Sequence, residues 1–338
     1  MEIKVLNRKQ LEKILEMPAV IEGVKAVYAA KAKGGTAVWP LVEHHFPELK
    51  AVTDVRSGAV MGDVNVHGLK MLNNFPGNAG TEFPVFGGML MVFDSTNGAP
   101  LGIMDASYIT CMRTGAAGGI SAALFSRKDA STLMILGAGR QSIYQIGAAL
   151  LLMPGIKKLV VCDPLSPDGA KGYVEALPGN LKTQLNVERP DVEMIAEPDV
   201  QKAVGQADTI ITITPSRTPV IKKEWVKPGT HFSCIGADMV GKEEIDPETF
   251  RGARVFCDDI DQCCRVGETE IPFKTGVIAK EQIAGEIGQV LNGMVPGRTD
   301  DEQITVFDAT GLAPLDLVTA KAAVKLAKEN GLGLTAEL

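Results

Sequence analysis

The sequence lacks the features that mark several large classes of protein. It contains four histidines and two tryptophans among 338 residues, and aromatic side chains make up 5% of the chain. No apolar run reaches the ~18 residues that a membrane-spanning helix needs, so we expect no membrane partner. Lys and Arg total 34 against 41 Asp and Glu, and this acidic balance argues against nucleic acid as a partner.

Two further absences concern location and metals. The first residues mix charged with apolar side chains, where a signal peptide would need a continuous apolar segment. The six cysteines lack the spacing of metal fingers, and four histidines are too few for a histidine-rich metal centre. We therefore expect a cytoplasmic protein with reduced thiols and no metal site.

What is present is the composition of a globular protein, with 45% hydrophobic and 22% charged residues. At ~150 residues per domain, the length predicts two domains, or one large α/β unit with an appendage. The first ~35 residues predict two helices, the first capped by Asn7 and the second opened by Pro18. Between residues 39 and 107, short alternating runs separated by turn sequences predict a mainly antiparallel sheet.

The pattern changes at residue 116. A stretch of small residues, 116–124, predicts a tightly packed helix, and a tail helix is expected at 315–330, stopped by Gly331. Between them, helical segments alternate with apolar runs at 132–136, 159–162, 192–196, 209–214, 231–235, 255–258 and 304–307. Several of these runs are apolar on both alternations, which predicts a doubly wound parallel sheet covered by helices on both faces.

A glycine turn follows the first of these runs and leads into a helical segment; its residues are Gly137, Ala138, Gly139, Arg140 and Gln141. The first glycine permits a tight turn, and the second lets backbone N–H groups approach a pyrophosphate at a helix N-terminus. Ser142 stands where a third glycine or alanine is usual, a mild departure because serine is also small. The turn predicts a dinucleotide site.

Two polar residues at the ends of later runs extend this prediction. Asp163 lies 26 residues after Gly137, against the ~20 typical of the motif. A carboxylate there accepts hydrogen bonds from ribose hydroxyls and repels a 2′-phosphate, which predicts NAD rather than NADP. Thr214 ends another run, at the sheet edge where the nicotinamide half would lie. The structural alternatives are a loop aspartate and an ordinary strand-ending turn.

Charged residues also occur inside apolar or glycine-rich segments. Lys70 shares a strand face with Val66 and Leu72, so its amine is expected to be partly buried, with a lowered pKa. Arg113 and Thr114 precede the small-residue helix, where the arginine suits a carboxylate and the threonine a cap or a phosphate contact. Asp238 follows a strand in a glycine-flanked loop, a place suited to acid–base chemistry. The structural alternatives are a solvent-facing lysine, a cap with a surface salt bridge, and a turn aspartate.

Taken in chain order over most of the sequence, these segments resemble the ornithine cyclodeaminase/mu-crystallin family. The resemblance rests on Gly68-Leu69-Lys70, Phe75-Pro76-Gly77-Asn78, Arg113-Thr114-Gly115-Ala116, Gly137-Ala138-Gly139-Arg140-Gln141, Gly236-Ala237-Asp238 with Gly241-Lys242, and Phe307-Asp308-Ala309-Thr310-Gly311 with Asp316. It implies an α/β protein in which a Rossmann domain, residues 116–314, is inserted in an α+β substrate-binding and dimerisation domain, residues 1–115 plus 315–338. It also implies a homodimer.

The resemblance further implies roles for individual residues. Lys70 would bind substrate and handle a proton, Arg113 would anchor the substrate carboxylate, and Asp238 would be the catalytic acid or base. The family commonly has a second arginine in a Pro-x-Arg sequence, but here Pro40 is followed by Leu41 and Val42. Either His44 or His45 takes its place, or the acid group is held differently.

These inferences predict an NAD-dependent enzyme that acts on a small L-amino acid through an imine. Hydrolysis of the imine gives an amino-acid dehydrogenase, attack by a side-chain amine gives a cyclodeaminase, and the reverse reaction gives a ketimine or iminosuccinate reductase. A crystallin-like dinucleotide binder without activity is the alternative of another class, although retention of Lys70, Arg113 and Asp238 counts against it. A hydroxy-acid dehydrogenase would want a histidine base near the cofactor, and His231 begins its run instead of following it.

Overall fold

The computed structural model describes residues 1–338 and divides the chain into two compact units. The terminal unit comprises Met1–Arg113 and Leu312–Leu338, and the inserted unit comprises Thr114–Gly311. The domain boundaries expected from the sequence, at 115/116 and 314/315, lie two and three residues from these. No helix is long and apolar enough to cross a membrane.

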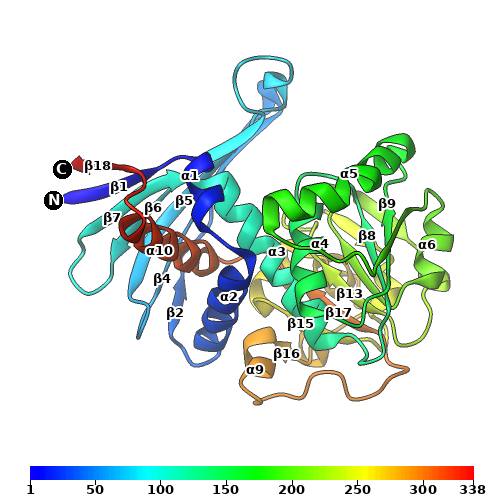
Figure 1. Ribbon diagram of the computed structural model, residues 1–338. Coiled ribbons are helices and arrows are strands. Elements are labelled where there is room, and N and C mark those ends of the chain that lie inside the picture. The colour runs from blue at the N-terminus through cyan, green and yellow to red at the C-terminus, as the bar shows by residue number, and fades with distance from the viewer. The chain divides into compact units, whose positions relative to one another are not determined.

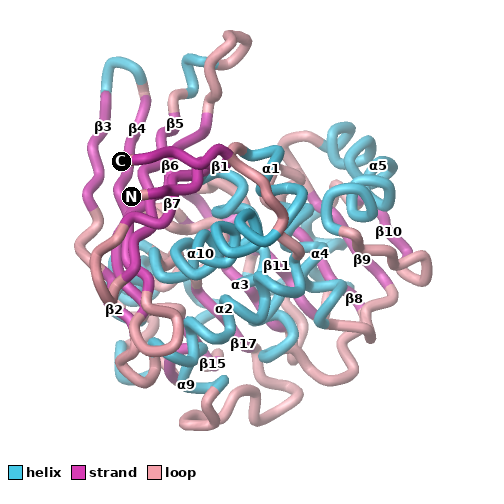
Figure 2. The backbone as a smooth tube through the Cα atoms, turned by 60° about the vertical axis from the view of Figure 1, so that its left-hand side comes forward, coloured by secondary structure: helices cyan, strands magenta, loops and turns pink.

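The terminal unit is built on one sheet (Figure 2). Its strands are, in spatial order, β18 (Leu334–Glu337), β1 (Glu2–Leu6), β7 (Pro100–Asp105), β6 (Phe86–Asp94), β5 (Val66–Asn74), β4 (Ala51–Val60) and β2 (Thr36–Val38), with β3 (Val42–Phe46) also paired to β4. The pairs between β2 and β7 are antiparallel, as the alternating runs predict.

The helices of this unit are α1 (Arg8–Ile14), α2 (Met17–Lys31) and α10 (Ala313–Glu329). As predicted, the Asn7 side chain caps α1 and Pro18 lies in the first turn of α2. Helix α10 packs on α2, β4 and β5. The expectation that the first ~35 residues are wholly helical is wrong at its start. Residues 2–6 instead form β1, whose ladder partners β7 and β18 come from distant parts of the sequence.

Helix α3 (Ala106–Phe125) begins before the small-residue stretch. The Asp105 side chain accepts a hydrogen bond from the Tyr108 backbone N–H and so caps the first turn. The expectation that Arg113 and Thr114 stand at a helix start is therefore wrong, because the helix begins seven residues before Arg113. Thr114 lies inside the helix and does not cap it.

The inserted unit contains a sheet of parallel strands (Figure 1). In spatial order they are β10 (Glu193–Ala196), β9 (Lys158–Cys162), β8 (Thr132–Leu136), β11 (Thr209–Thr212), β13 (His231–Cys234), β17 (Thr305–Asp308), β15 (Arg254–Cys257) and β16 (Gly285–Glu286). From β8 the order runs outward to β9 and β10 on one side and to β11 and β13 on the other, with β17 inserted between β13 and β15, which confirms the predicted doubly wound fold.

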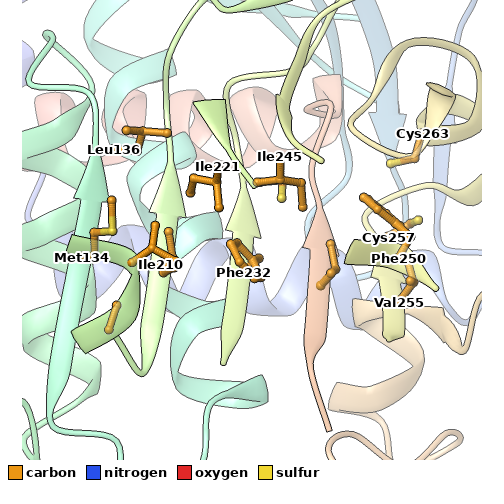
Figure 3. Packing of buried hydrophobic residues seen from close by; sticks show 14 of the residues in the cluster. Met134, Leu136, Ile210, Ile221, Phe232, Ile245, Phe250, Val255, Cys257 and Cys263 are labelled. Carbon is orange, nitrogen blue, oxygen red and sulfur yellow. The ribbon is translucent and has the colours of Figure 1, made fainter. Parts of the chain in front are cut away.

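Further elements surround this sheet. The helices are α4 (Ser142–Leu152), α5 (Pro167–Leu185), α6 (Val200–Gln206), α7 (Ile260–Val266), α8 (Glu270–Lys274) and α9 (Ile287–Leu291), and β12 (Arg217–Ile221) pairs with β14 (Glu243–Ile245). Apolar side chains from adjacent strands form one continuous row on one face of the sheet, with Met134, Ile210, Phe232 and Val255 among them (Figure 3). Phe125 of α3 stacks on Phe256 on the other face. The sheet is thus buried on both faces.

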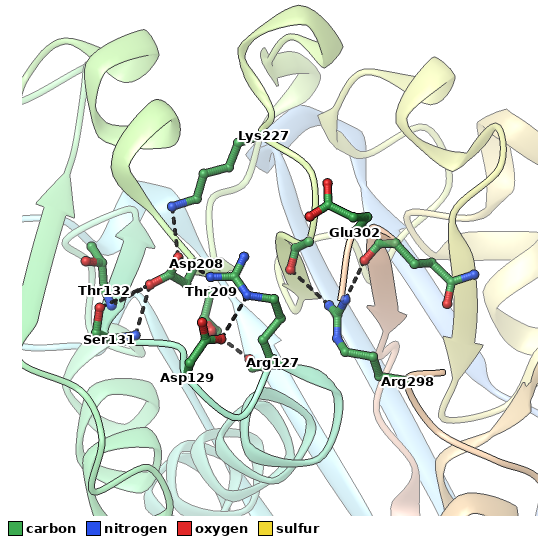
Figure 4. Close-up of polar contacts among 12 residues, drawn as sticks. Arg127, Asp129, Ser131, Thr132, Asp208, Thr209, Lys227, Arg298 and Glu302 are labelled. Atoms are coloured by element: carbon green, nitrogen blue, oxygen red, sulfur yellow. Dashed lines mark hydrogen bonds and ion pairs between the residues drawn. The ribbon is translucent and has the colours of Figure 1, made fainter. Parts of the chain in front are cut away.

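The amino edge of this sheet is held by a polar network (Figure 4). Asp208 accepts hydrogen bonds from Arg127, Lys227 and the Ser131 and Thr132 backbone N–H groups. Burial alone would raise the pKa of Asp208, but Lys227 and the two backbone donors outweigh it and lower the pKa to about 2. Arg127 and Lys227 at this edge already pair with Asp208. Ligands of doubly wound folds bind at the opposite, carboxyl edge of the sheet, so ligand chemistry is expected there.

Candidate active site

The first group of candidate residues lies in the terminal unit, around a buried lysine. Lys70 on β5 is 1% exposed, and its Nζ lies 2.9 Å from both carboxylate oxygens of Asp316 on α10. Burial lowers the pKa of Lys70 to about 8, because its effect exceeds that of the adjacent Asp316, which raises the pKa. An amine with such a pKa changes protonation close to neutral pH and can therefore serve in proton transfer.

Arg113 belongs to the same group. Its Nε donates a hydrogen bond of 3.0 Å to Asp316, and only 8% of its side chain is exposed. Burial by itself would raise the pKa of Asp316, but the charges of Arg113 and Lys70 outweigh it and lower the pKa below its usual value. One ionised carboxylate therefore orients two buried cations, and the group carries a net positive charge that suits an anionic substrate.

Arg56 is a third cation on the same face of the sheet. It lies directly opposite Lys70 in the β4–β5 ladder, and its charge contributes to lowering the pKa of that lysine. The side chain is 13% exposed, with Nε 3.8 Å from Asp54. His44 and His45, the residues proposed to replace the second arginine, are exposed on β3, and His45 pairs with Glu43. The structure thus offers an arginine beside Lys70 that the sequence alone did not single out.

The second group lies in the inserted unit, where β8 leads through the glycine turn into α4. Gly137 has φ +105°, a conformation that other residues rarely adopt. A Cβ added to Gly139 would meet nothing within 4 Å, so there is open space beside this part of the turn. Ser142, in the third motif position, is fully buried; its hydroxyl donates to the Gly139 carbonyl and also forms a hydrogen bond with the Tyr173 hydroxyl. The serine therefore replaces the third glycine by stabilising the turn from within.

Several polar atoms near the turn fit a dinucleotide. Thr114 Oγ1 and Gln141 Oε1 are buried and have no hydrogen-bond partner, as expected of groups that meet a ligand. Asp163, just after β9, accepts a hydrogen bond from the Ala138 backbone N–H, which places its carboxylate beside the turn. Arg140 is exposed in the turn, and Thr214 follows β11 beside Gly137. The residues present thus match the requirements of a pyrophosphate and a ribose.

Asp238 lies in the loop after β13, at the carboxyl edge of the parallel sheet. Its carboxylate is 42% exposed and pairs with Lys242, whose Nζ lies 2.7 Å from Oδ1. Accessible carboxylates at this edge are well placed for acid–base work. By contrast, His231 at the amino end of β13 is buried between Thr305 and Ser233, and burial lowers its pKa to about 3. That histidine is neutral and enclosed, which is unsuitable for a catalytic base.

Each unit therefore gathers part of the candidate site. Lys70, Arg113 and Asp316 meet in the terminal unit, while the turn, Asp163, Thr214 and the Asp238 loop surround the carboxyl edge in the inserted unit. Asp316 pairs with Lys70 across 246 sequence positions, and no local pattern signals that contact. The register of β4 and β5 puts Arg56 opposite Lys70, and that register can be read from the sequence only where the turn between the two strands is located.

Comparison with known proteins agrees with this arrangement. The profile of the ornithine cyclodeaminase/mu-crystallin family matches residues 1–330. The chain belongs to this family. Among family members, the alanine dehydrogenase of Archaeoglobus fulgidus is 33% identical over 335 residues, which cover 98% of each chain. This confirms the resemblance seen in the sequence.

Solved structures of family members share the whole fold. An archaeal alanine dehydrogenase, a dimer with bound NAD, has a TM-score of 0.91 and 32% identity, with all of both chains covered. The iminosuccinate reductase of Paracoccus denitrificans in complex with NAD⁺ also has a TM-score of 0.91, with 29% identity over all of both chains. The ornithine cyclodeaminase/mu-crystallin fold is thus the fold of this chain.

Proposed function

We propose that the chain is an NAD-dependent enzyme that exchanges a hydride between the α-carbon of a small L-amino acid or its imine and nicotinamide C4. The observation that carries this proposal is the buried group of Lys70, Arg113 and Asp316, which keeps two oriented cations in a protein of this family. Cations held in fixed geometry bind a carboxylate and leave the neighbouring α-carbon in a defined position.

The cofactor would be held by residues of the inserted unit. The turn at Gly137–Gly139 would receive the pyrophosphate, the unpartnered oxygens of Thr114 and Gln141 would contact the ligand, and Thr214 would face its nicotinamide half. Asp163 would accept hydrogen bonds from the ribose hydroxyls and repel a 2′-phosphate, which favours NAD over NADP. Bound NAD supplies the hydride chemistry, while the protein supplies orientation and charge.

The catalytic roles follow from the charges of the side chains. Arg113 holds the substrate carboxylate through its guanidinium, and Arg56 gives a second grip from the same face of the sheet. Lys70, with a pKa of about 8, donates a proton or a hydrogen bond to the imine or carbonyl group that replaces the substrate amine. Asp238 accepts a proton from the substrate amine or from the water that attacks the imine.

An amino-acid dehydrogenase is the first candidate, because the alanine dehydrogenase relative matches along the full length at 33% identity. A reductase of a dicarboxylic imine is the second candidate. The second acid group of such a substrate would need a further cation, and Arg56 supplies one beside Lys70. Iminosuccinate reductase of Paracoccus denitrificans, a relative at 29% identity in its solved structure, acts in that chemical class by name.

A substrate panel tests the proposal. Alanine, aspartate, ornithine and lysine are assayed with NAD and with NADP, and pyruvate and oxaloacetate are assayed with ammonia and NADH. A dehydrogenase accumulates NADH, a reductase consumes it, and a cyclodeaminase releases ammonia with no net change in NADH. Binding of NADH without turnover of any compound would contradict the enzymatic proposal and support a crystallin-like binder.

Two variants then test the assigned residues. Arg113→Lys keeps the charge but loses the planar guanidinium, so KM for the carboxylate substrate should rise about 100-fold. Asp238→Asn should lower kcat by about 100-fold or more, because the amide cannot accept a proton. NADH affinity, measured by fluorescence, should be unchanged in both. Parent values of kcat in Asp238→Asn would remove this residue from the mechanism.

We also propose that the chain forms a homodimer through the open face of the terminal sheet. A row of apolar residues crosses four strands on the face opposite Lys70: Val42, Val55, Met71 and Met89 are consecutive ladder partners. Met89 is 63% and Val42 62% exposed, and a monomer rarely leaves a continuous apolar row in contact with water. Met89→Lys should yield monomers in sedimentation experiments, and a parent that sediments as a monomer would contradict the proposal.

A further inference from the structure

The loop that carries Asp238 is held by two buried glutamates. Glu244 on β14 is fully buried, and Glu270 at the start of α8 is 2% exposed. Neither glutamate is among the residues proposed to bind the substrate or the cofactor. Their carboxylates do not point at solvent but accept hydrogen bonds from backbone N–H groups of the loops at the carboxyl edge of the sheet.

Glu244 ties two loops together. Its Oε2 accepts from the Gly236 backbone N–H at 3.0 Å and from the Thr212 hydroxyl at 2.7 Å. Its Oε1 accepts from the Thr214 backbone N–H at 2.6 Å. One carboxylate therefore fixes the start of the Asp238 loop, after β13, and the Thr214 turn, after β11. Both oxygens are needed, because the three donors approach from both sides.

The glycine at the start of the loop is explained by this carboxylate. A Cβ added to Gly236 would lie 2.4 Å from Glu244 Oε2 and 2.4 Å from the Thr214 carbonyl oxygen. No side chain fits there unless the loop or the carboxylate moves. The closeness of the packing shows that the loop start is placed against Glu244 itself.

Glu270 holds the other end of the loop. Its Oε2 accepts from the Gly241 backbone N–H at 2.8 Å, and Oε1 pairs with the partly exposed Lys274. Gly241 has φ +73°, so the chain reverses direction at this point. Lys242, the next residue, reaches back to Asp238 and to the Gly236 carbonyl. The two ends of the loop are thus fixed while the Asp238 carboxylate between them stays accessible.

A third carboxyl group supports the first. Glu268 Oε1 accepts from the backbone N–H groups of Glu244 and Ile245, each at 2.8 Å, and so fixes the strand that presents Glu244. Burial raises the pKa of Glu244 above its usual range, which shows that it has no neighbouring cation to compensate for its desolvation. Removing this carboxyl would leave the Gly236 and Thr214 N–H groups without their acceptor, which costs free energy for buried donors.

We propose that Glu244 and Glu270 are positioning residues for Asp238: Glu244 fixes the start of its loop together with the Thr214 turn, and Glu270 fixes the end. This inference rests on the proposed function, in which Asp238 transfers a proton and Thr214 faces the nicotinamide half. It predicts different consequences for the two glutamates, because only Glu244 also holds the Thr214 turn.

The experiment compares alanine and glutamine at position 270 with glutamine at position 244. Glu270→Ala frees the Gly241 N–H and should lower kcat by about 10-fold to 100-fold, with NADH affinity unchanged. Glu270→Gln keeps one acceptor oxygen for Gly241 and should restore most of the loss. Glu244→Gln should not be rescued in this way, because one acceptor oxygen cannot serve donors on both sides, and it should lower both kcat and NADH affinity.

Matched controls are available beside each position. Glu243→Gln changes the adjacent buried glutamate of β14, for which no side-chain hydrogen bond to the loops is present, and Lys274→Ala removes the partner of Glu270 without touching Gly241. Both should retain the parent kcat and NADH affinity. Thermal unfolding of every variant shows whether a change in activity follows a general loss of stability.

A double-mutant cycle separates positioning from general destabilisation. If Glu270 acts through Asp238, then adding Glu270→Ala to Asp238→Asn should lower the residual single-turnover rate no further. Multiplicative losses, or a parent kcat in Glu270→Ala, would overturn the inference while leaving the role of Asp238 intact. A parent kcat in Asp238→Asn would instead overturn the proposed role of Asp238, and the inference with it. If Glu244→Gln fails to fold, the Glu270 series decides.

Discussion

In the terminal unit, a single buried carboxylate, Asp316, lies between Lys70 and Arg113, with Arg56 close by. In the inserted unit, carboxyl groups gather at the carboxyl edge of the sheet without any ion pair among them: Glu244, Glu268, Asp258 and Asp308, none more than 1% exposed. The first cluster has an excess of cations and the second has none.

The two clusters differ in what compensates for burial. Neighbouring cations lower the pKa of Asp316, so this carboxylate stays ionised and fixes the charges around it. The acids of the inserted unit accept hydrogen bonds mainly from backbone N–H groups. These donors compensate for burial less than cations do, so burial raises the pKa values of these acids. The terminal cluster therefore keeps a net positive charge, which suits the anion binding that we propose for it, while the inserted cluster accepts hydrogen bonds from the loops around it.

The largest effect is expected from Asp316→Asn, which removes the charge that the terminal cluster depends on. The amide keeps the shape but leaves Lys70 and Arg113 without a counter-charge, so the free energy of unfolding should fall by about 3–5 kcal/mol. Because Asp316 raises the pKa of Lys70, that pKa should fall further below about 8. Urea unfolding measures the first effect. Parent stability in this variant would mean that the cations do not depend on Asp316.

A second substitution, at Arg56, tests whether the terminal cluster binds an anion. Arg56→Gln removes the cation opposite Lys70 but retains hydrogen-bonding groups. KM for the carboxylate substrate should rise about 10-fold to 100-fold, the range expected for a charge-assisted hydrogen bond, with little change in kcat. His44→Ala and His45→Ala serve as comparisons and should leave KM unchanged. A rise in KM in a histidine variant alone would assign the second grip to β3.

The sequence predicts the inserted unit better than the terminal one, and the reason is physical. Strands buried on both faces are apolar throughout, so β8 is predicted from Thr132 to Leu136 with its observed bounds. Strands β1 and β18 carry no such signal, because they are short and partly exposed and depend on pairing with each other. Their existence is set by tertiary contacts between the two ends of the chain.

The site shows the same division. The glycine turn and Asp163 are recognisable because the motif is local, within 30 residues of sequence. The pairing of Lys70 with Asp316, by contrast, joins residues 246 positions apart. Arg113 was expected at a helix start because the small residues after it dominate the local pattern, whereas the Asp105 cap lies eight residues earlier. No sequence pattern signals the roles of Glu244 and Glu270, since the loop groups that they hold are backbone N–H groups.

Replacing an acid by its amide can also be tested in the buried acidic cluster of the inserted unit, at Asp308. Burial raises the pKa of Asp308 from 3.8 to about 7, so the folded protein binds a proton there more tightly than the unfolded chain does. The stability that this group contributes is full below pH 3.8 and is lost as the pH rises through about 7. Asp308→Asn mimics the protonated form, so above pH 7 the variant should be at least as stable as the parent. A large loss at pH 8 would show that the ionised form is required.

The last and smallest effect is expected where pairing occurs without burial. Asp191 pairs with Lys157 and Arg189 but is 44% exposed, and Lys157 is 64% exposed. Arg189 also donates to the carbonyls of Leu150, Pro154 and Ile156, so it stays in place without its acid partner. Asp191→Asn should leave the urea midpoint unchanged, because water and salt already screen an exposed pair. If this variant lost as much stability as Asp316→Asn, ion pairing and not burial would determine how much Asp191 and Asp316 each contribute to stability.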